Sequence, residues 1–139
     1  MSSFTDKLHL VYYPKKNIWK TGRDFLYFVG EEYGKEKILV PKGFETDLAS
    51  VPWPASMFIP KAGQYNQAAV LHDYLYSRLG VLEEKTYSRA ECDMIFLEAM
   101  EVIGVPKWKR LIMYRAVRLG GWLPWRSHAY KNETKKEKK

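Results

Sequence analysis

The chain lacks the features that mark secreted, membrane-spanning and zinc-clustered proteins. It has a single cysteine, Cys92, in 139 residues, so neither an intramolecular disulfide nor a cysteine-based zinc cluster can form. No segment approaches the roughly 20 apolar residues of a membrane helix. The first residues, MSSFTDKLHL, lack the basic and apolar regions of a signal peptide. We therefore expect a protein of the reducing cytoplasm without a membrane span.

Several sequence motifs of catalysis are also missing. The chain has no HExxH zinc motif, and Ser50 lacks the GxSxG surroundings of a hydrolase nucleophile. The glycine pair Gly120-Gly121 follows an expected helix instead of preceding one, so it does not indicate a phosphate-binding loop. Any chemistry must therefore come from side chains that the fold brings together.

The composition is that of a globular domain with a basic tail. Hydrophobic residues make up 46% of the chain and aromatic residues 15%, which is enough for a core without disulfides. The net charge is +7, and residues 131–139 hold five lysines and two glutamates. We expect a single domain over 1–130 and a disordered basic tail over 131–139. The tail either keeps the protein soluble or adds attraction to nucleic acid or anionic lipid.

The first half of the sequence predicts strands. Aromatic and β-branched residues are frequent in 8–13, 24–29 and 37–41, and the connections are too short for helical crossovers, so we expect a three-stranded antiparallel sheet. Residues 42–66 have no periodicity and contain Pro52, Pro54 and Pro60. Prolines stiffen such a segment, and long loops are often functional.

The second half predicts three helices. The first covers 67–79 and stops at Gly80. The second follows a capping box of Ser88 and Glu91 and ends near Gly104, and the third begins at Pro106 and reaches about 119. Residues 122–130 are expected to be irregular. The fold class is therefore α+β, with a small N-terminal antiparallel sheet followed by a three-helix segment.

One carboxylate in the second helix breaks the amphipathic pattern. At about 100° per residue, Asp93 falls within the apolar arc, between Leu97 and Met100. A buried carboxylate is costly unless it is paired or hydrogen-bonded, so Asp93 needs partners. The most economical arrangement gathers polar residues of the loop and the first two helices: Asp47, His72, Asp73 and Asp93.

Three interpretations of this cluster stay open. All four residues could bind a divalent metal, because one histidine with carboxylates suits magnesium, manganese, zinc or iron. An Asp–His pair could instead act as a general base without metal. In the third interpretation the cluster is a buried structural network, in which Asp93 accepts from His72, Arg89 or loop amides. Cys92, on the apolar side of its helix, is expected to be buried and inert.

The third helix mixes cations with aromatic residues, as surfaces that bind single-stranded nucleic acid or proteins do. In the alternative interpretation, Trp108 and Tyr114 belong to the core and Arg115 or Arg118 pairs with a buried carboxylate such as Asp93. The residues concerned are Lys107, Trp108, Lys109, Arg110, Leu111, Ile112, Tyr114, Arg115, Ala116, Val117 and Arg118, followed by Trp122, Trp125 and Arg126.

Four segments together resemble a phage- and prophage-associated family of domains of unknown function, number 1353. They are VPKGFETDLASVP at 40–52, AAVLHDYLY at 68–76, RAECD at 89–93 with Phe96, and MYRAVRLG at 113–120. The similarity covers roughly 37–121, and the TDLASVP and LHDYLY blocks are specific in combination. Cys92 departs from the helix residue expected there. The resemblance implies a phage or prophage origin and places the four polar residues within matching blocks, but it implies no activity.

Three functional hypotheses follow for a phage-encoded protein of the host cytoplasm or the virion. The first is a small hydrolase-like enzyme with a metal or Asp–His centre at Asp47, His72, Asp73 and Asp93. The second is a non-enzymatic virion assembly component or host-factor binder that uses the basic aromatic helix. The third is binding of nucleic acid through the same surface and the lysine tail.

Overall fold

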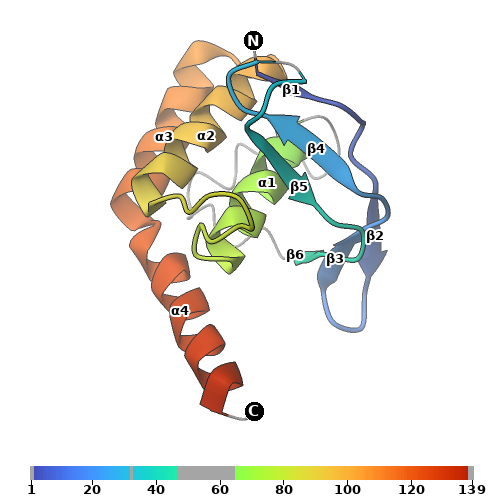
Figure 1. Ribbon diagram of the computed structural model, residues 1–139, viewed down its shortest axis with the longest axis vertical. Coiled ribbons are helices and arrows are strands. Elements are labelled where there is room, and N and C mark those ends of the chain that lie inside the picture. Colours follow the sequence, from blue (N-terminus) through green and yellow to red (C-terminus); the bar gives the residue numbers. More distant parts are fainter. Residues whose placement is uncertain (1, 32, 47–64, 138–139) are drawn as a thin grey trace.

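The computed structural model describes residues 2–31, 33–46 and 65–137, which contain six short strands and four helices. The strands lie in the first third of the chain and the helices follow, so the expected α+β class is confirmed (Figure 1). The elements are β1 (Ser3–Phe4), β2 (Leu10–Tyr13), β3 (Ile18–Thr21), β4 (Phe25–Phe28), β5 (Lys37–Val40), β6 (Glu45–Thr46), α1 (Tyr65–Ser77), α2 (Arg89–Val102), α3 (Lys107–Gly120) and α4 (Trp122–Glu137).

The strands form two antiparallel sheets of three, not the single meander predicted from the sequence. One sheet has the order β1-β4-β5 and the other β2-β3-β6. The three expected strands are present as β2, β4 and β5, and β4 pairs with β5 as predicted. The prediction was wrong in pairing, because β2 turns back at 14–17 and pairs with β3, where Tyr13 faces Ile18. Asn17, at φ 52°, takes the left-handed conformation that this tight turn requires.

The helices begin and end close to the predicted residues. Ser88 accepts from the Glu91 amide while the Glu91 carboxylate accepts from the Ser88 amide, so the expected capping box starts α2. Pro106 precedes α3 at its N-cap. After α1 the chain turns at Gly80, at φ +71°, where a Cβ would lie 1.9 Å from the Tyr87 carbonyl oxygen. The closeness of these two segments therefore requires glycine at position 80.

Residues 122–130 were predicted to be irregular, and the structure corrects this: they form the first part of α4. The helical backbone continues through 131–137, within the segment expected to be a disordered tail. In Figure 1, α4 follows the end of α3 and carries the C-terminus away from the rest of the molecule. Across the described ranges, no helix has the length and apolar content needed to cross a membrane.

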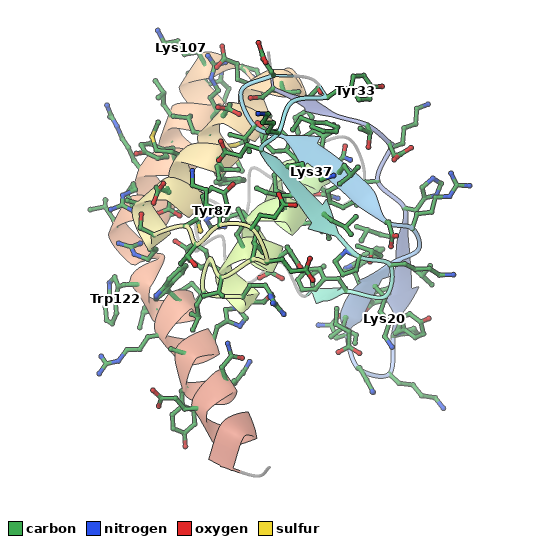
Figure 2. All side chains as sticks on the ribbon, in the orientation of Figure 1. Lys20, Tyr33, Lys37, Tyr87, Lys107 and Trp122 are labelled. Atoms are coloured by element: carbon green, nitrogen blue, oxygen red, sulfur yellow. The ribbon has the colours of Figure 1, made fainter. Side chains whose placement is uncertain are left out.

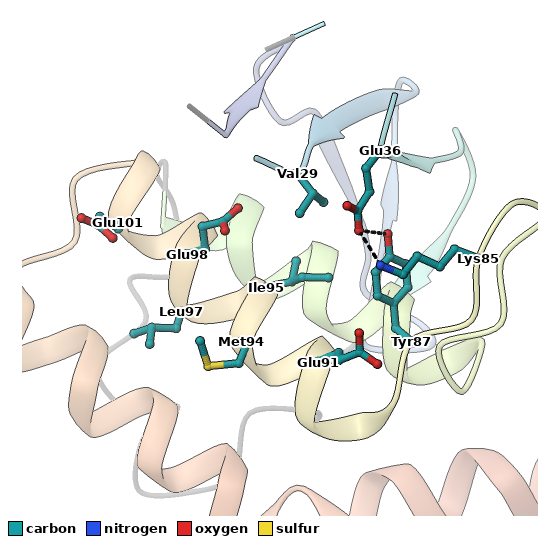
Figure 3. Close-up of a pocket in the computed structure, with 10 residues that line it drawn as sticks. All are labelled: Val29, Glu36, Lys85, Tyr87, Glu91, Met94, Ile95, Leu97, Glu98 and Glu101. Carbon is teal, nitrogen blue, oxygen red and sulfur yellow. Dashed lines mark hydrogen bonds and ion pairs between the residues drawn. The ribbon is translucent and has the colours of Figure 1, made fainter. Parts of the chain in front are cut away.

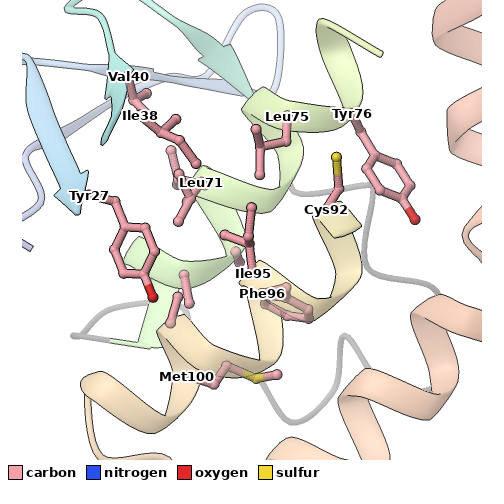
Figure 4. Packing of buried hydrophobic residues seen from close by; sticks show 14 of the residues in the cluster. Tyr27, Ile38, Val40, Leu71, Leu75, Tyr76, Cys92, Ile95, Phe96 and Met100 are labelled. Carbon is pink, nitrogen blue, oxygen red and sulfur yellow. The ribbon is translucent and has the colours of Figure 1, made fainter. Parts of the chain in front are cut away.

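The core lies between the β1-β4-β5 sheet and the helices. Tyr27 of β4 and Ile38 of β5 point from the sheet toward Leu71 of α1 and Ile95 of α2 (Figure 4). These side chains are buried, as are most residues of α1 that follow Tyr65. Because α1 is covered on nearly all sides, polar residues along it must find partners inside the protein.

Candidate functional site

The predicted inward carboxylate, Asp93, lies at the centre of the most concentrated polar network among the described residues. Its side chain is fully buried. The Oδ1 atom accepts from His72 Nε2 at 2.7 Å and from the Tyr76 hydroxyl at 2.6 Å. Both donors come from α1, one helical turn apart, so they approach the carboxylate from the same side.

The second oxygen of Asp93 faces two arginines. Arg118 of α3 donates from Nη1 to Oδ2 at 2.8 Å, and Arg89 Nη1, one turn before Asp93 on α2, lies 3.5 Å from the same atom. Arg89 also donates to the Val117 carbonyl oxygen at 3.1 Å. The network therefore joins three helices, and its charge-assisted contacts hold α3 against α2 and α1.

The balance of these contacts keeps Asp93 ionised. Burial acts to raise the pKa of its carboxyl group, but the hydrogen bonds from His72, Tyr76 and Arg118 outweigh it, and the pKa is lowered. Burial and the adjacent Asp93 raise the pKa of the Tyr76 phenol well above its ordinary range. Since an ionised carboxylate only accepts hydrogen bonds, His72 must carry a proton on Nε2.

The other ring nitrogen of His72 is the unusual atom of the network. Within the described part of the chain, Nδ1 is buried and has no hydrogen-bond partner. The ring lies between Tyr76 and Phe96, with centroid distances of 4.2 and 4.6 Å. With Nε2 oriented by Asp93, Nδ1 is the position where this pair could accept a proton, but the imidazole has no exposure to solvent.

The structure brings together some of the predicted site residues and separates others. His72 and Asp93 meet, as expected, whereas Asp73 is held by the hydroxyl of Thr46 at the end of β6. Neighbouring helical residues diverge by about 100°, which accounts for the separation of His72 from Asp73. Asp47 lies outside the described residues. Among those described, no group of three or more histidine, cysteine, aspartate or glutamate side chains is placed to hold a metal ion.

Cys92, beside Asp93, is buried as expected. Burial, together with the nearby carboxylates, raises the pKa of its thiol to about 12. At such a pKa the thiol is protonated at neutral pH, a state that does not favour nucleophilic attack.

A separate cleft lies on the other side of α2. It has a volume of about 380 Å³ and is rich in glutamates (Figure 3). At one end Glu36 accepts from Lys85 at 3.1 Å and from the Tyr87 hydroxyl at 2.8 Å. The remaining lining includes apolar Met94. Among the described residues, those that line this cleft include none of the Asp93 network.

The outer face of α3 and of the start of α4 is apolar and basic. Lys107 and Trp122 project from it (Figure 2). We call it the α3–α4 face and define it by its large apolar residues, which are 43% to 80% exposed, and its exposed cations. These are Trp108, Ile112, Leu119, Trp122 and Leu123, with Lys107, Arg115 and Arg126.

For helix α3, the structure contradicts one interpretation of the sequence and supports another. Trp108 was considered as a core residue, but its side chain is 61% exposed because α3 turns that side outward. Arg118, in contrast, does pair with Asp93. The exposure of Leu119 was not anticipated, although Trp108, Ile112, Arg115 and Leu119 follow the 4-3-4 spacing of a single helical stripe.

Sequence reasoning also missed Tyr76 as a partner of Asp93. The available signal was its position four residues after His72, which places both on the same side of α1. A tyrosine in an otherwise apolar helix face normally finds an acceptor for its hydroxyl group when it is buried.

Fold and network together define a small α+β domain whose three core helices are tied by one buried carboxylate. The chain belongs to the family described as "Protein of unknown function (DUF1353)", whose model matches residues 19–117. The family expected from the sequence is thereby confirmed.

Among the curated proteins, the chain is similar to an uncharacterized protein, y4jT, of Sinorhizobium fredii. The two are 36% identical over 84 residues, which is 59% of this chain and 23% of the relative. The chain thus spans about a quarter of that protein's length. No solved structure matches.

Proposed function

We propose that this is a non-enzymatic, phage- or prophage-encoded binding protein whose partner docks on the α3–α4 face. The observation that carries the proposal is the exposure of Leu119, Trp122 and Leu123 on a surface that is otherwise cationic. Contiguous exposed apolar side chains with a charged rim are typical of protein interaction sites. The protein would act in the host cytoplasm or in the virion, as an assembly component or a binder of a host factor.

The buried network supports binding over catalysis. His72 and Asp93 are fully buried, and Asp93 accepts hydrogen bonds from two helices, α1 and α3. A substrate would have to displace Arg118 or Tyr76 before reaching the carboxylate. The network is better suited to keep α3 in place, which presents the α3–α4 face as a preformed surface.

The charge of the face indicates an acidic protein partner. Residues 107–131 contain seven lysines and arginines and no aspartate or glutamate. Such a segment attracts anions of any kind. The aliphatic side chains of Ile112, Leu119 and Leu123 add contacts that suit an apolar protein surface with an acidic rim, whereas single-stranded nucleic acid relies on aromatic stacking.

A double variant, Leu119→Ser with Leu123→Ser, tests the proposal. Cross-linking in producing cells, followed by identification of the captured proteins, should yield one acidic partner at near-equal stoichiometry. We expect capture to fall at least about tenfold in the double variant, since two exposed anchors are lost. Val11→Ser, which changes a 49% exposed apolar residue on β2, should leave capture unchanged.

Equal capture by the double variant would overturn the proposal. So would tight binding of a single-stranded DNA 20-mer that weakens steeply with salt, because counterion release is the mark of a nucleic-acid surface.

A second candidate, a hydrolase-like enzyme, is favoured by the Nδ1 atom of His72, which is buried and has no hydrogen-bond partner among the described residues. In this proposal Asp93 orients the imidazole, and Asp47 joins the pair in an acid–base or divalent-metal site, whereas Asp73, held by Thr46, stays outside it. Metal analysis of protein purified without a histidine tag tests the metal version. A melting temperature that drops with chelator in the wild type, but not in His72→Ala or Asp47→Asn, would support it. A chelator-insensitive melting temperature together with metal-free protein would refute it.

A further inference from the structure

Strand β5 lies at the end of the strand order β1-β4-β5. It pairs with β4 on one side, and no strand among the described residues pairs with the other side. The Val29 amide donates to the Glu36 carbonyl oxygen, and the register continues with Phe28 opposite Lys37. Antiparallel bonds alternate along a strand, so Ile38 and Val40 bond to β4, whereas Lys37 and Leu39 direct their N–H and C=O groups outward.

The neighbouring strand agrees with this assignment. Leu26 of β4, which faces Leu39, uses its carbonyl oxygen to accept from the Thr5 amide on the β1 side. In the described part of the chain, no backbone hydrogen bond joins Lys37 or Leu39 to a residue beyond β4. Lys37 and Leu39 therefore each present one N–H and one C=O group at this edge, and no described backbone group bonds to them.

A large cleft lies beside the same edge. Its volume is about 800 Å³, and it runs between β5 and the connection from α1 to α2. Apolar side chains of Leu39, Tyr74 and Leu82 line it. Leu39 is 48% exposed, and Lys37 and Tyr87, which also line the cleft, can be located in Figure 2.

We propose that this cleft binds an extended peptide, which adds a strand to β5. Backbone donors and acceptors repeated at every second residue match an extended chain, and hydrogen bonds of this kind are the basis of strand addition. The four residues of β5 would pair with a peptide segment of similar length. The site is distinct from the α3–α4 face and extends beyond the function proposed above.

Charge specifies the peptide further. Lys35 and Lys37 line the strand side of the cleft, and neither has a carboxylate partner among the described residues. The acidic lining residues Glu83 and Glu84 belong to the connection from α1 to α2, on the other side of the cleft from β5. Glu36, between the two lysines, is already engaged by Lys85 and Tyr87. An acidic residue opposite Lys37 would form a favourable cross-strand pair. The peptide is therefore expected to carry a carboxylate at that position and apolar residues toward Tyr74 and Leu82.

The same charges argue against a second copy of this chain as the occupant. Edge strands are commonly protected from self-association by lysine and proline, and β5 has Lys37 at its start and Pro41 directly after its end. Two β5 edges would bring lysines of both copies to one small interface. An acidic peptide meets no such repulsion.

The test uses a surface-displayed library of random seven-residue peptides, selected against the full chain. Enriched peptides should share an acidic residue flanked by apolar ones. Leu39→Pro removes the outward N–H group together with the leucine side chain, at an edge position where strands tolerate proline. It should weaken binding of an enriched peptide about tenfold, the effect of one lost hydrogen bond. Leu39→Thr, which keeps the N–H, should bind within about twofold of the wild type.

A second measurement does not depend on the stability of a variant. Single N-methylation at successive residues of the enriched peptide should weaken binding at every second position, because alternate amides face β5. Enrichment of no peptide, loss of binding without this two-residue period, or equal binding by Leu39→Pro would overturn the proposal. If the chain dimerises, and the Lys37→Glu variant dimerises more strongly than the wild type, the occupant of this edge is a second copy of the chain and not a peptide. The Leu119→Ser/Leu123→Ser variant should bind these peptides normally, so the two surfaces are tested independently.

Discussion

Asp93 of α2 and Arg118 of α3 meet at 2.8 Å between Oδ2 and Nη1, with the carboxylate fully buried and the arginine side chain about one-third exposed. This pair connects the interior of the protein to the helix that forms its apolar and basic outer face. Asp93 also accepts hydrogen bonds from His72 and Tyr76. If its carboxylate is removed, these two buried donors lose their acceptor as well.

Asp93→Asn should therefore destabilise the fold by about 3–5 kcal/mol, the usual cost of breaking a buried ion pair on one side. The amide can accept fewer hydrogen bonds, and it leaves the charge of Arg118 uncompensated. Urea unfolding measures the change. Glu133→Gln, at an exposed position of α4, is the matched control and should change stability by less than about 0.5 kcal/mol. A loss below about 1 kcal/mol for Asp93→Asn would contradict the network's structural role.

The same carboxylate makes stability depend on pH in a defined direction. The pKa of Asp93 is lower in the folded protein than its ordinary value, so the folded state binds the proton less readily than the unfolded state does. Its contribution is fully present above about pH 5, beyond the unfolded pKa of about 3.9. It is lost as the pH falls toward the folded pKa.

Urea unfolding of the wild type and Asp93→Asn between pH 6 and pH 3 checks this dependence. The difference in unfolding free energy between the two proteins should shrink as the solution is acidified. A difference that stays constant or grows toward acidic pH would show that the ionised form of Asp93 is not the stabilising one.

Cys92 should react slowly with thiol-specific reagents. Burial raises the pKa of its thiol to about 12, so at pH 8 the reactive thiolate is scarce and the sulfur is inaccessible. The rate of modification in native buffer should be at least about 100-fold below the rate in denaturant, where the pKa returns to about 8.5. A rate in native buffer close to that of the unfolded chain would show that this part of α2 opens readily.

Truncation of two residues of α3 that are two positions apart should change the stability of the fold by very different amounts. Val117 is fully buried and Leu119 is 80% exposed. Val117→Ala should cost about 1.5–3 kcal/mol, since it removes buried methyl groups and leaves a cavity. Leu119→Ser should stay within about 0.5 kcal/mol of the wild type. Thermal and urea unfolding of both variants check the prediction, and a large loss for Leu119→Ser would place that residue inside the core.

Most of the buried part of the site could be predicted from the sequence. Helical periodicity placed Asp93 inward, and the cost of a buried carboxylate required donors such as His72 and Arg118. Spacing alone does not tell which of His72 and Asp73 turns toward α2, because the angle at which two helices cross depends on side chains from both. That choice, and the participation of Tyr76, became apparent only in the fold.

Other elements were missed for local reasons. The strand Ile18–Thr21 follows the 14–17 turn directly, and its partner β6 has only two residues, so no alternating run was long enough to reveal the second sheet. In α4, the segment 122–130 contains Pro124 among its aromatic residues, and it shows no clear helical pattern. Pro124 lies in the first turn of the helix, where a missing N–H breaks no intrahelical bond.

Gly121 occupies the point where α3 gives way to α4, and it is buried beside the ionic network. A Cβ at this position would lie 2.3 Å from the Val117 carbonyl oxygen, 2.5 Å from the Tyr76 hydroxyl oxygen and 3.1 Å from Arg89 Nη1. The groups that surround Asp93 therefore also govern the direction in which the last helix leaves the domain. A larger residue here would meet both the last turn of α3 and the groups around Asp93, so the route of the chain from α3 into α4, and with it the placement of Trp122 and Leu123 beside Leu119, depends on a side chain that is absent.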